Sequence, residues 1–579
     1  MHCSKKRPAG SAVAAILTMA AAMILPLPRA ARAAPAKAPA KTGAAAPASG
    51  VTLVWDDKQG LHGLRVNGAN LLESGALRVE GVTLQSWDGT TRPADLSRVT
   101  QTVNAARREV TQTFPFGLTI RCRYEVPTPH PDRLDLTVTV ENTGEAVVRA
   151  VTLDLATLRF PRTPQGWDPN VPYWAHNVGS PTVIGADFGV GTLALCNEDV
   201  GRPLLVGFPF PSDRPAARTY PLRVSSANQN WLAPFLDPYL DRPIFPGGRD
   251  VYRLSLRFGA AKTAPEELAA DVYEHFARAY PARPRWPDRR PIGQLVLSSV
   301  ADQHKSPTNP RGWLNDPTID VTSEAGRARF RGRLLAYADQ SVRILRDMNA
   351  QGAIVWDAEG QEFPHATSYL GDPRALPPEM ENGALLDAFF ARLRAAGLRT
   401  GICIRPQRPV RPVYGAPAEA FQIAVADPAA NLAEKITYAR KRWNCTLFYI
   451  DSNGDPNVPD DANVFRRLAK AFPDVLLIPE HQNTAYFAST APYDELRGGI
   501  AGTSGAVRRV YPDAFSVIAV QDGPIQARHS DLVASVAHGD VLLFRAWFDD
   551  ALFNAPVRRI YEEAAARRKT TNTPPAARP

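Results

Sequence analysis

The first half of the chain alternates apolar and polar residues with a period of two. Residues 134–140 read LDLTVTV, and the turn sequence ENTGE follows them directly. This is the pattern of a strand with one buried face that ends in a tight turn. Similar short segments continue from residue 51 to about residue 260, and no long helical period interrupts them. We therefore predict an antiparallel β-sandwich over residues 51–260.

A short transition follows this region. Residues 264–280, APEELAADVYEHFARAY, have acidic residues in their first turn, which is typical of a helix start. The sequence PARPRWPDRRPIG then runs to residue 293 and is rich in proline and arginine. We interpret residues 261–293 as a helix and a connector between two domains.

From residue 294 to residue 566, apolar strand-like runs alternate with amphipathic helical segments. The eight runs are QLVLSSV (294–300), GAIVW (352–356), LRTGICI (398–404), TLFYI (446–450), VLLIP (475–479), RGGIAGTSG (497–505), FSVIAV (515–520) and VLLFR (541–545). The sixth run is the weakest of them. This size and rhythm predict a (β/α)8 TIM-type barrel, so the fold class is a multidomain β plus α/β protein. An open doubly wound sheet is the alternative, but the chain has no glycine-rich phosphate loop.

The two ends of the sequence differ from the domains in composition. Residues 1–33 combine a basic start, an apolar middle and a small-residue end, which predicts a cleaved signal peptide and a secreted or periplasmic protein. The apolar run is short for a membrane span. Residues 34–50 form an Ala/Pro-rich tether, and residues 567–579 are expected to be a disordered tail. The high content of alanine, arginine and proline is typical of a bacterial chain.

Charge and cysteine content exclude some classes of protein. The net charge of +9 falls to +4 when the five basic residues of the signal peptide are removed, and the remaining basic residues are scattered. We therefore expect no nucleic-acid partner. Of five cysteines, one leaves with the signal peptide, and the others have neither disulfide-framework nor metal-ligand spacing. A single Cys122–Cys196 bridge and buried free thiols both remain open.

Polar side chains follow the predicted barrel strands where each strand ends, which is where barrel enzymes place their chemistry. The candidate catalytic residues are Asp451 and Glu480. The candidate substrate-binding residues are Asp357, Glu359, His365, Arg405, Gln407, Asn453, His481, Asp522, Arg545 and Trp547. A single Asp after a strand is more often a turn or helix-cap residue. Consecutive strands that all end in charged side chains favour a functional site.

Asp451 and Glu480 form the central pair of this prediction. They end successive strands, and neighbouring strands lie about 4.8 Å apart. Hydrolysis of a glycosidic bond needs one carboxylic acid that protonates the leaving oxygen and one carboxylate that attacks or activates water. With Arg405 on the preceding strand to keep Asp451 ionised, we expect Asp451 to be the nucleophile or base and Glu480 the proton donor. Asp522 is the alternative acid.

Other chemistries receive less support. Asp357, Glu359, His365 and His481 are candidate ligands for a metal ion, but no H-E-x-x-H spacing is present, so we predict no metal and no cofactor. The absence of a G-x-S-x-G sequence weakens an esterase interpretation. Trp547 is a candidate platform for sugar stacking, although an aromatic residue in such a position more often packs in the core.

The order of signal peptide, β-sandwich, connector and barrel resembles glycoside hydrolases of the alpha-galactosidase and related retaining superfamilies. Those families carry a nucleophilic Asp at the end of barrel strand four, often in a Y-x-K-x-D-like strand, and FYID places Asp451 there without the Lys. An acid on strand five, Glu480, is similar to the alpha-amylase arrangement, whereas the alpha-galactosidase group has its acid on strand six. The resemblance implies a glycosidase and leaves the exact family open.

We therefore expect an exported glycoside hydrolase that acts on the O-glycosidic bonds of a poly- or oligosaccharide, with carbohydrate as its partner and no membrane span. A non-catalytic carbohydrate-binding protein on a barrel scaffold is one alternative. A metal-dependent hydrolase or lyase is another. Barrels host many chemistries, so the fold alone does not separate these three hypotheses.

Overall fold

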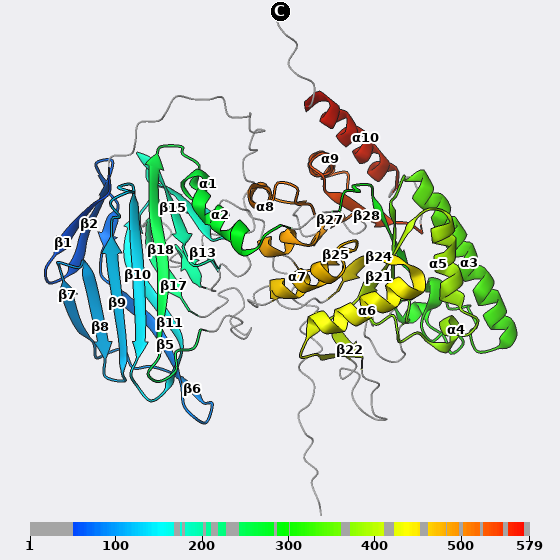
Figure 1. Cartoon of the computed structure of the whole chain (residues 1–579), viewed down its shortest axis with the longest axis horizontal. Coiled ribbons are helices and arrows are strands. Elements are labelled where there is room, and N and C mark those ends of the chain that lie inside the picture. The colour runs from blue at the N-terminus through cyan, green and yellow to red at the C-terminus, as the bar shows by residue number, and fades with distance from the viewer. Residues whose placement is uncertain are drawn as a thin grey trace, which may run out of the picture. The chain divides into compact units, whose positions relative to one another are not determined.

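The computed structural model of the chain describes residues 50–166, 174–176, 180–200, 204–209, 218–226, 242–282, 286–299, 301–360, 371–409, 422–451, 461–481, 483–496, 502–520, 525–547 and 554–571. Within them the chain forms antiparallel sheets up to residue 260 and a parallel sheet after residue 291 (Figure 1). This confirms the predicted fold class of a β-sandwich followed by a TIM-type barrel. No helix among these residues has the length and apolar character needed to cross a membrane.

The N-terminal sheets are antiparallel throughout. One has the strand order β12-β14-β15-β18-β10-β9-β8-β7, and a second has the order β13-β16-β17-β11-β5-β6, with β4 paired to β11 and a small β1-β2-β3 sheet beside them. The strands are β1 Thr52–Asp56, β2 Gly60–Val66, β3 Ala69–Asn70, β4 Leu72–Ser74, β5 Arg78–Gln85, β6 Thr91–Pro93, β7 Thr100–Asn104, β8 Glu109–Phe114, β9 Leu118–Glu125, β10 Arg133–Asn142, β11 Val147–Arg159, β12 Gln165–Gly166, β13 Trp174–His176, β14 Val183–Asp187, β15 Gly191–Asn197, β16 Leu205–Gly207, β17 Thr219–Ser225 and β18 Arg249–Ala260.

The sandwich core follows from the period-two pattern. In β10, Leu134, Leu136, Val138 and Val140 are all buried, and the polar residues between them are partly exposed. Cys122 and Cys196 are buried free thiols. The bridge between them that the sequence left open is therefore absent, and the free-thiol alternative holds.

The segment 264–280, expected as one helix, forms two: α1 Pro265–Leu268 and α2 Ala270–Ala279. They are separated by Ala269, whose backbone has φ −106° and ψ 15° and is therefore not helical.

The parallel sheet has the order β25-β24-β21-β20-β19-β28-β27-β26. Its strands are β19 Ile292–Val296, β20 Gly352–Trp356, β21 Arg399–Ile404, β24 Cys445–Ile450, β25 Leu476–Pro479, β26 Tyr493–Glu495, β27 Val517–Ala519 and β28 Val541–Arg545. The first strand pairs with the eighth, and the amide of Ala491 donates to the carbonyl of Leu477 between the fifth and sixth. The sheet is thus an eight-stranded, nearly closed barrel.

Helices cover the outer face of this barrel (Figure 1). They are α3 Glu324–Asp347, α4 Pro378–Glu381, α5 Leu385–Ala395, α6 Pro428–Trp443, α7 Asp461–Ala471, α8 Gly505–Val510, α9 His529–Ala537 and α10 Asn554–Thr571, and a two-stranded hairpin, β22 Gln407–Pro409 and β23 Gln422–Ala424, follows β21. Local sequence sets the ends of α6. The Asp427 side chain accepts a hydrogen bond from the amide of Ala430, Pro428 opens the helix, and Asn444 ends it in the left-handed conformation.

Two sequence-based boundaries need correction. The sixth strand is Tyr493–Glu495, which lies before the segment 497–505 in which we expected it, and the described residues 502–505 of that segment form no strand. Helix α10 continues to Thr571, so residues 567–571, expected to belong to a disordered tail, are helical. Pairing with β27 makes Tyr493–Glu495 the sixth strand, whereas residues 567 and 568 at the end of α10 are exposed, so burial does not account for the extension of that helix.

Candidate active site

The alternation of side chains along the barrel strands decides which residues face the barrel axis. In β24, Tyr449 packs in the interior cluster of the barrel, whereas Ile450 packs in the outer cluster beneath the helices. In β21, Cys403 faces inward and Ile404 outward in the same way. Successive side chains of a strand point to opposite faces. Asp451 follows the outward-facing Ile450, so its side chain points into the barrel at the carboxyl end of β24.

The strand register then brings three of the predicted residues together. Ile404 pairs with Ile450, and Ile450 pairs with Pro479. The backbone pairing continues one residue further, because the amide of Asp451 donates to Ile404 and that of Glu480 donates to Ile450, at 2.9 and 3.0 Å. Arg405, Asp451 and Glu480 consequently occupy matching positions on three neighbouring strands.

Arg405 and Asp451 form a close ion pair. The guanidinium donates from Nε and Nη2 to the same carboxylate oxygen, Oδ2, at 2.9 and 2.6 Å. The side chains are only 12% and 6% exposed. A pair this little exposed is screened weakly by water, so the guanidinium is an effective counter-charge for an ionised carboxylate.

Glu480 lies in a more open environment than Asp451. Its side chain is 31% exposed, and that of the adjacent His481 is 47% exposed. The nearest nitrogen of His481 lies 4.0 Å from the Glu480 carboxylate. The Asp451 carboxylate thus has a buried guanidinium as its partner, whereas the Glu480 carboxylate has access to solvent, so the two groups lie in different environments.

An additional carboxylate, Glu495, belongs to this end of the barrel and was missed by the sequence analysis. It ends the short strand β26, two residues after the inward-facing Tyr493, so it has the same inward orientation. The Tyr493 hydroxyl lies 3.3 Å from Glu495 Oε1. The period-two spacing of Tyr493 and Glu495 is the only local signal, and three residues are too few to reveal a strand.

Aromatic rings fill the barrel directly below these carboxylates. The Tyr449 ring lies 5.0 Å from the rings of both Trp356 and Tyr493, measured between centroids. Burial raises the pKa of the Tyr449 phenol well above its ordinary value, and the negative charge of Glu480 adds to this effect. The aromatic layer therefore forms an apolar floor beneath the charged residues.

The structure places the other predicted site residues in several environments. Asp357 follows β20 in a left-handed conformation, with φ 57°, and is 5% exposed. Arg545 ends β28 two residues after the inward-facing Leu543, and its guanidinium lies 5.8 Å from the Trp547 ring. His365, Asn453 and Asp522 lie outside the described residues.

Glu359 and Gln407 lie around a buried cluster beside the mouth of the barrel. Glu359 is 2% exposed, and burial raises the pKa of its carboxyl to about 7. Its Oε1 has no hydrogen-bond partner among the described residues. The backbone carbonyl of Gln407 accepts from the Lys435 ammonium at 2.6 Å. Glu359, expected to bind substrate, thus belongs to the interior of the protein in this structure.

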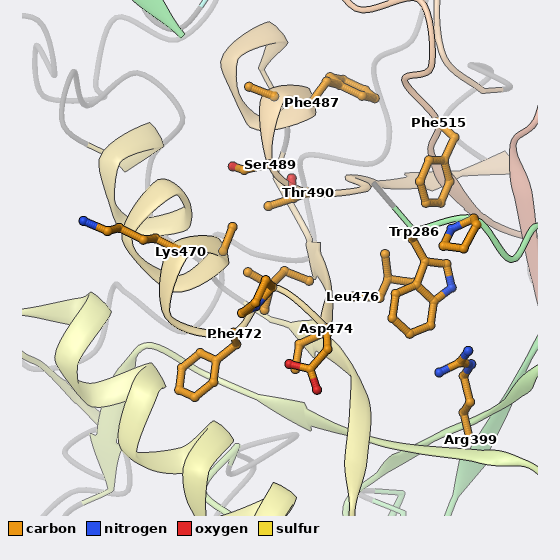
Figure 2. A pocket seen from close by; sticks show the side chains of 16 residues that line it. Trp286, Arg399, Lys470, Phe472, Asp474, Leu476, Phe487, Ser489, Thr490 and Phe515 are labelled. Atoms are coloured by element: carbon orange, nitrogen blue, oxygen red, sulfur yellow. The ribbon is translucent and has the colours of Figure 1, made fainter. Parts of the chain in front are cut away.

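A cavity of about 310 Å³ lies at the other end of the barrel (Figure 2). Its walls include Trp286, Arg399, Leu476 and Phe515. Arg399 and Leu476 are the first residues of their strands, β21 and β25. The chemistry of parallel barrels resides at the carboxyl ends of the strands, so this cavity is separate from the candidate active site.

Within the part of the chain that the structure describes, no group of three or more His, Cys, Asp or Glu side chains is arranged to hold a metal ion. Of the four ligands considered from the sequence, Asp357, Glu359 and His481 are described and His365 is not.

Comparisons with known proteins place the fold. No family model matches the sequence, and no curated protein matches it. The alpha-N-acetylgalactosaminidase NagBb from Bifidobacterium bifidum, solved in complex with GalNAc, shares the fold with a TM-score of 0.53 and 11% identity over 90% of this chain and 92% of that chain. The GH36 alpha-galactosidase AgaB from Geobacillus stearothermophilus matches with a TM-score of 0.40 and 12% identity, over 92% and 76% of the two chains. The likeness to NagBb, at this low identity, shows the fold alone.

Proposed function

We propose that this protein is an exported glycoside hydrolase that cleaves O-glycosidic bonds of a poly- or oligosaccharide. The observation that carries the proposal is the placement of Asp451 and Glu480 in register on neighbouring strands, with Arg405 paired to Asp451. Two carboxylates with different surroundings at the carboxyl end of a barrel suit this reaction.

Each carboxylate has a distinct role in this proposal. Asp451, next to the Arg405 guanidinium, is the ionised group that attacks the anomeric carbon or activates a water molecule. Glu480, which is more exposed, is the carboxylic acid that protonates the leaving oxygen. Glu495 is the alternative donor, since it ends strand six on the inward face.

The first substrates to test follow from the structural neighbour. NagBb is an alpha-N-acetylgalactosaminidase that was solved with GalNAc. We therefore propose alpha-linked N-acetylgalactosamine and galactose as the first terminal sugars to test, within a broader panel of oligosaccharides.

The test compares sugar release by the wild type with release by Asp451→Asn, Glu480→Gln and Glu495→Gln. These substitutions keep the shape of each side chain and remove the titrating group. Loss of a general acid or base typically lowers the rate by about 10²–10⁴-fold, so Asp451→Asn and one of the two glutamate variants should fall by at least that much. Asp474→Asn, at the amino-terminal end of the barrel, is the matched control.

The glutamate variants also identify the donor. A substrate with a good leaving group, such as a nitrophenyl glycoside, needs no protonation of the leaving oxygen and should restore much of the first step in the donor variant alone. Undiminished activity in Asp451→Asn would show that the proposed nucleophile is wrong. Binding without turnover by the wild type would favour the carbohydrate-binding protein instead.

Export is proposed from the signal-like residues 1–33. The expected result is that the protein recovered from the medium or periplasm of an expressing bacterium begins close to Ala34. Intact-mass measurement checks this, and a product that keeps residues 1–33 inside the cell would contradict it.

A further inference from the structure

A fully buried lysine lies beside the proposed active site and is not part of the chemistry described so far. Lys435, on helix α6, has a side-chain exposure of 0%. Its ammonium donates to the backbone carbonyl oxygens of Arg405 and Gln407, each at 2.6 Å. A buried charge is costly unless it is paired and hydrogen-bonded, so a lysine in this place needs the contacts that it makes.

Charged groups from several elements surround Lys435. Asp372, on the segment after β20, lies 3.8 Å from the ammonium and also receives two hydrogen bonds from Arg374, each at 2.8 Å. Arg374, Glu359 and Cys403 are the other ionisable groups that act on the lysine, and the positive charge of Arg374 lowers its pKa. Burial lowers the pKa of Lys435 to about 8, while the negative charge of Asp372 opposes this decrease.

The two carbonyls that Lys435 binds belong to the residues that follow β21, at the point where Arg405 turns toward Asp451. The backbone of Arg405 is also held from the other side, because its amide donates to the carbonyl of Gly371 at 3.0 Å. Gly371 has φ +65°, and a Cβ atom there would lie 2.7 Å from the Arg405 Cβ. No larger residue fits without displacing Arg405.

These contacts leave Arg405 little freedom. Gly371 binds its amide, Lys435 binds its carbonyl, and Asp451 binds its guanidinium. An error of about 1 Å in the position of a catalytic group can cost about 10²-fold in rate, so a backbone held at both peptide groups has a direct use in catalysis.

We propose that Lys435 is a positioning residue that fixes the backbone of Arg405 and thereby aims its guanidinium at the Asp451 carboxylate. The proposal rests on the proposed function for its kinetic consequences. Lys435 contacts no substrate in this role and acts through Arg405 alone. Its ammonium form binds the two carbonyls most strongly, because charge-assisted hydrogen bonds are about twice as strong as neutral ones.

The role predicts an alkaline limit on activity. The active form has Lys435 protonated, so kcat/KM should fall as the pH rises through about 8, and at pH 9 it should be roughly tenfold below its plateau. In Lys435→Arg the positive charge persists, so the decrease of kcat/KM near pH 8, the alkaline limb of the profile, should disappear. In Asp372→Asn the opposing negative charge is lost, and the limb should move to lower pH.

The distribution between kcat and KM gives a second readout. Arg405 is proposed to orient the attacking carboxylate, so Lys435→Met should lower kcat about 10-fold or more and leave KM within about twofold. Lys441→Met, an exposed lysine on the same helix, is the matched control and should change neither constant. A purely structural lysine would lower the yield of folded protein but leave the pH profile of the folded fraction unchanged.

Two results would overturn the proposal. One is an alkaline limb that stays near pH 8 in both Lys435→Arg and Asp372→Asn. The other is an unchanged distance between Arg405 and Asp451 in Lys435→Met, which can be measured even if the wild type releases no sugar. A wild type that releases no sugar would count against the proposed function alone. In that case a crystal structure of Lys435→Met decides, because we expect the Arg405 Nη2 to Asp451 Oδ2 distance to exceed 2.6 Å by more than 1 Å. An unchanged distance would show that Arg405 is positioned without the lysine.

Discussion

The buried carboxyl of Glu359 gives the sharpest prediction for stability. Its pKa is raised from 4.5 to about 7, chiefly by burial. The folded protein therefore keeps this proton in the range between pH 4.5 and pH 7, where the unfolded chain has lost it. Stability falls as the pH rises through a window in which the folded state binds more protons than the unfolded one.

The magnitude follows from the two pKa values. A pKa raised from 4.5 to about 7 corresponds to about 3 kcal/mol of lost stability above pH 7, since each pH unit is worth about 1.4 kcal/mol. Glu359→Gln keeps the shape and removes the group that must ionise. We expect the variant to match the wild type at pH 4 and to be more stable at pH 8 by up to about 3 kcal/mol.

Differential scanning calorimetry at pH 4, 6 and 8 measures this. For a domain near 250 residues, 1 kcal/mol changes Tm by about 2–4 °C, so the barrel transition of Glu359→Gln at pH 8 should rise by roughly 6–12 °C. Glu562→Gln, an exposed carboxylate on α10, is the control and should show no such difference. An equal Tm difference between wild type and Glu359→Gln at pH 4 and pH 8 would refute the reasoning.

The same variant tests the sequence-based role of Glu359. A residue that binds substrate should raise KM when it is changed, whereas a buried residue should leave KM unchanged while Tm rises. KM measured on the best sugar of the panel separates the two, because ground-state binding appears in KM.

Two further predictions concern the ion pair and the thiols. Arg405→Met should cost about 3–5 kcal/mol of stability, because it leaves the Asp451 carboxylate without its guanidinium. The double variant Arg405→Met/Asp451→Asn should cost less stability than the sum of the two single changes. Calorimetric Tm values of the four proteins measure this, and additive costs within about 0.5 kcal/mol would show that the two side chains do not stabilise each other. Cys122 and Cys196 are buried free thiols whose pKa burial raises to about 12, so they should react with a thiol reagent only after unfolding, and reductant should leave Tm unchanged. Rapid labelling of the native protein at these positions would contradict this.

Most strands of the barrel could be predicted from the local sequence. The run LFYI before Asp451 is apolar at successive positions, and its residues are buried on both faces of β24. Such a strand can be recognised without knowledge of its neighbours in the sheet, because both of its faces are apolar. The position of Asp451 at the end of that strand followed from the same pattern.

The sixth strand could not be predicted from the local sequence. Tyr493–Glu495 has only three residues, and two of them are acidic. Asp494 is nevertheless buried, with its carboxylate accepting from the amides of Glu495 and Gly502. Pairing with β27 makes this segment a strand, so Glu495 could be recognised as a site residue only once the sheet was known.

The sequence by itself thus determined the two fold types and, apart from the sixth strand, the barrel strands and the residues that end them, because the hydrophobic period is a local property of a chain. The tertiary structure decided which of those end residues face one another and which are buried. Lys435 has the sequence pattern of an ordinary helical lysine, and Glu359 that of a loop carboxylate. Their burial depends on carbonyls and charges contributed by Arg405, Gln407 and Asp372, which only the folded barrel brings together.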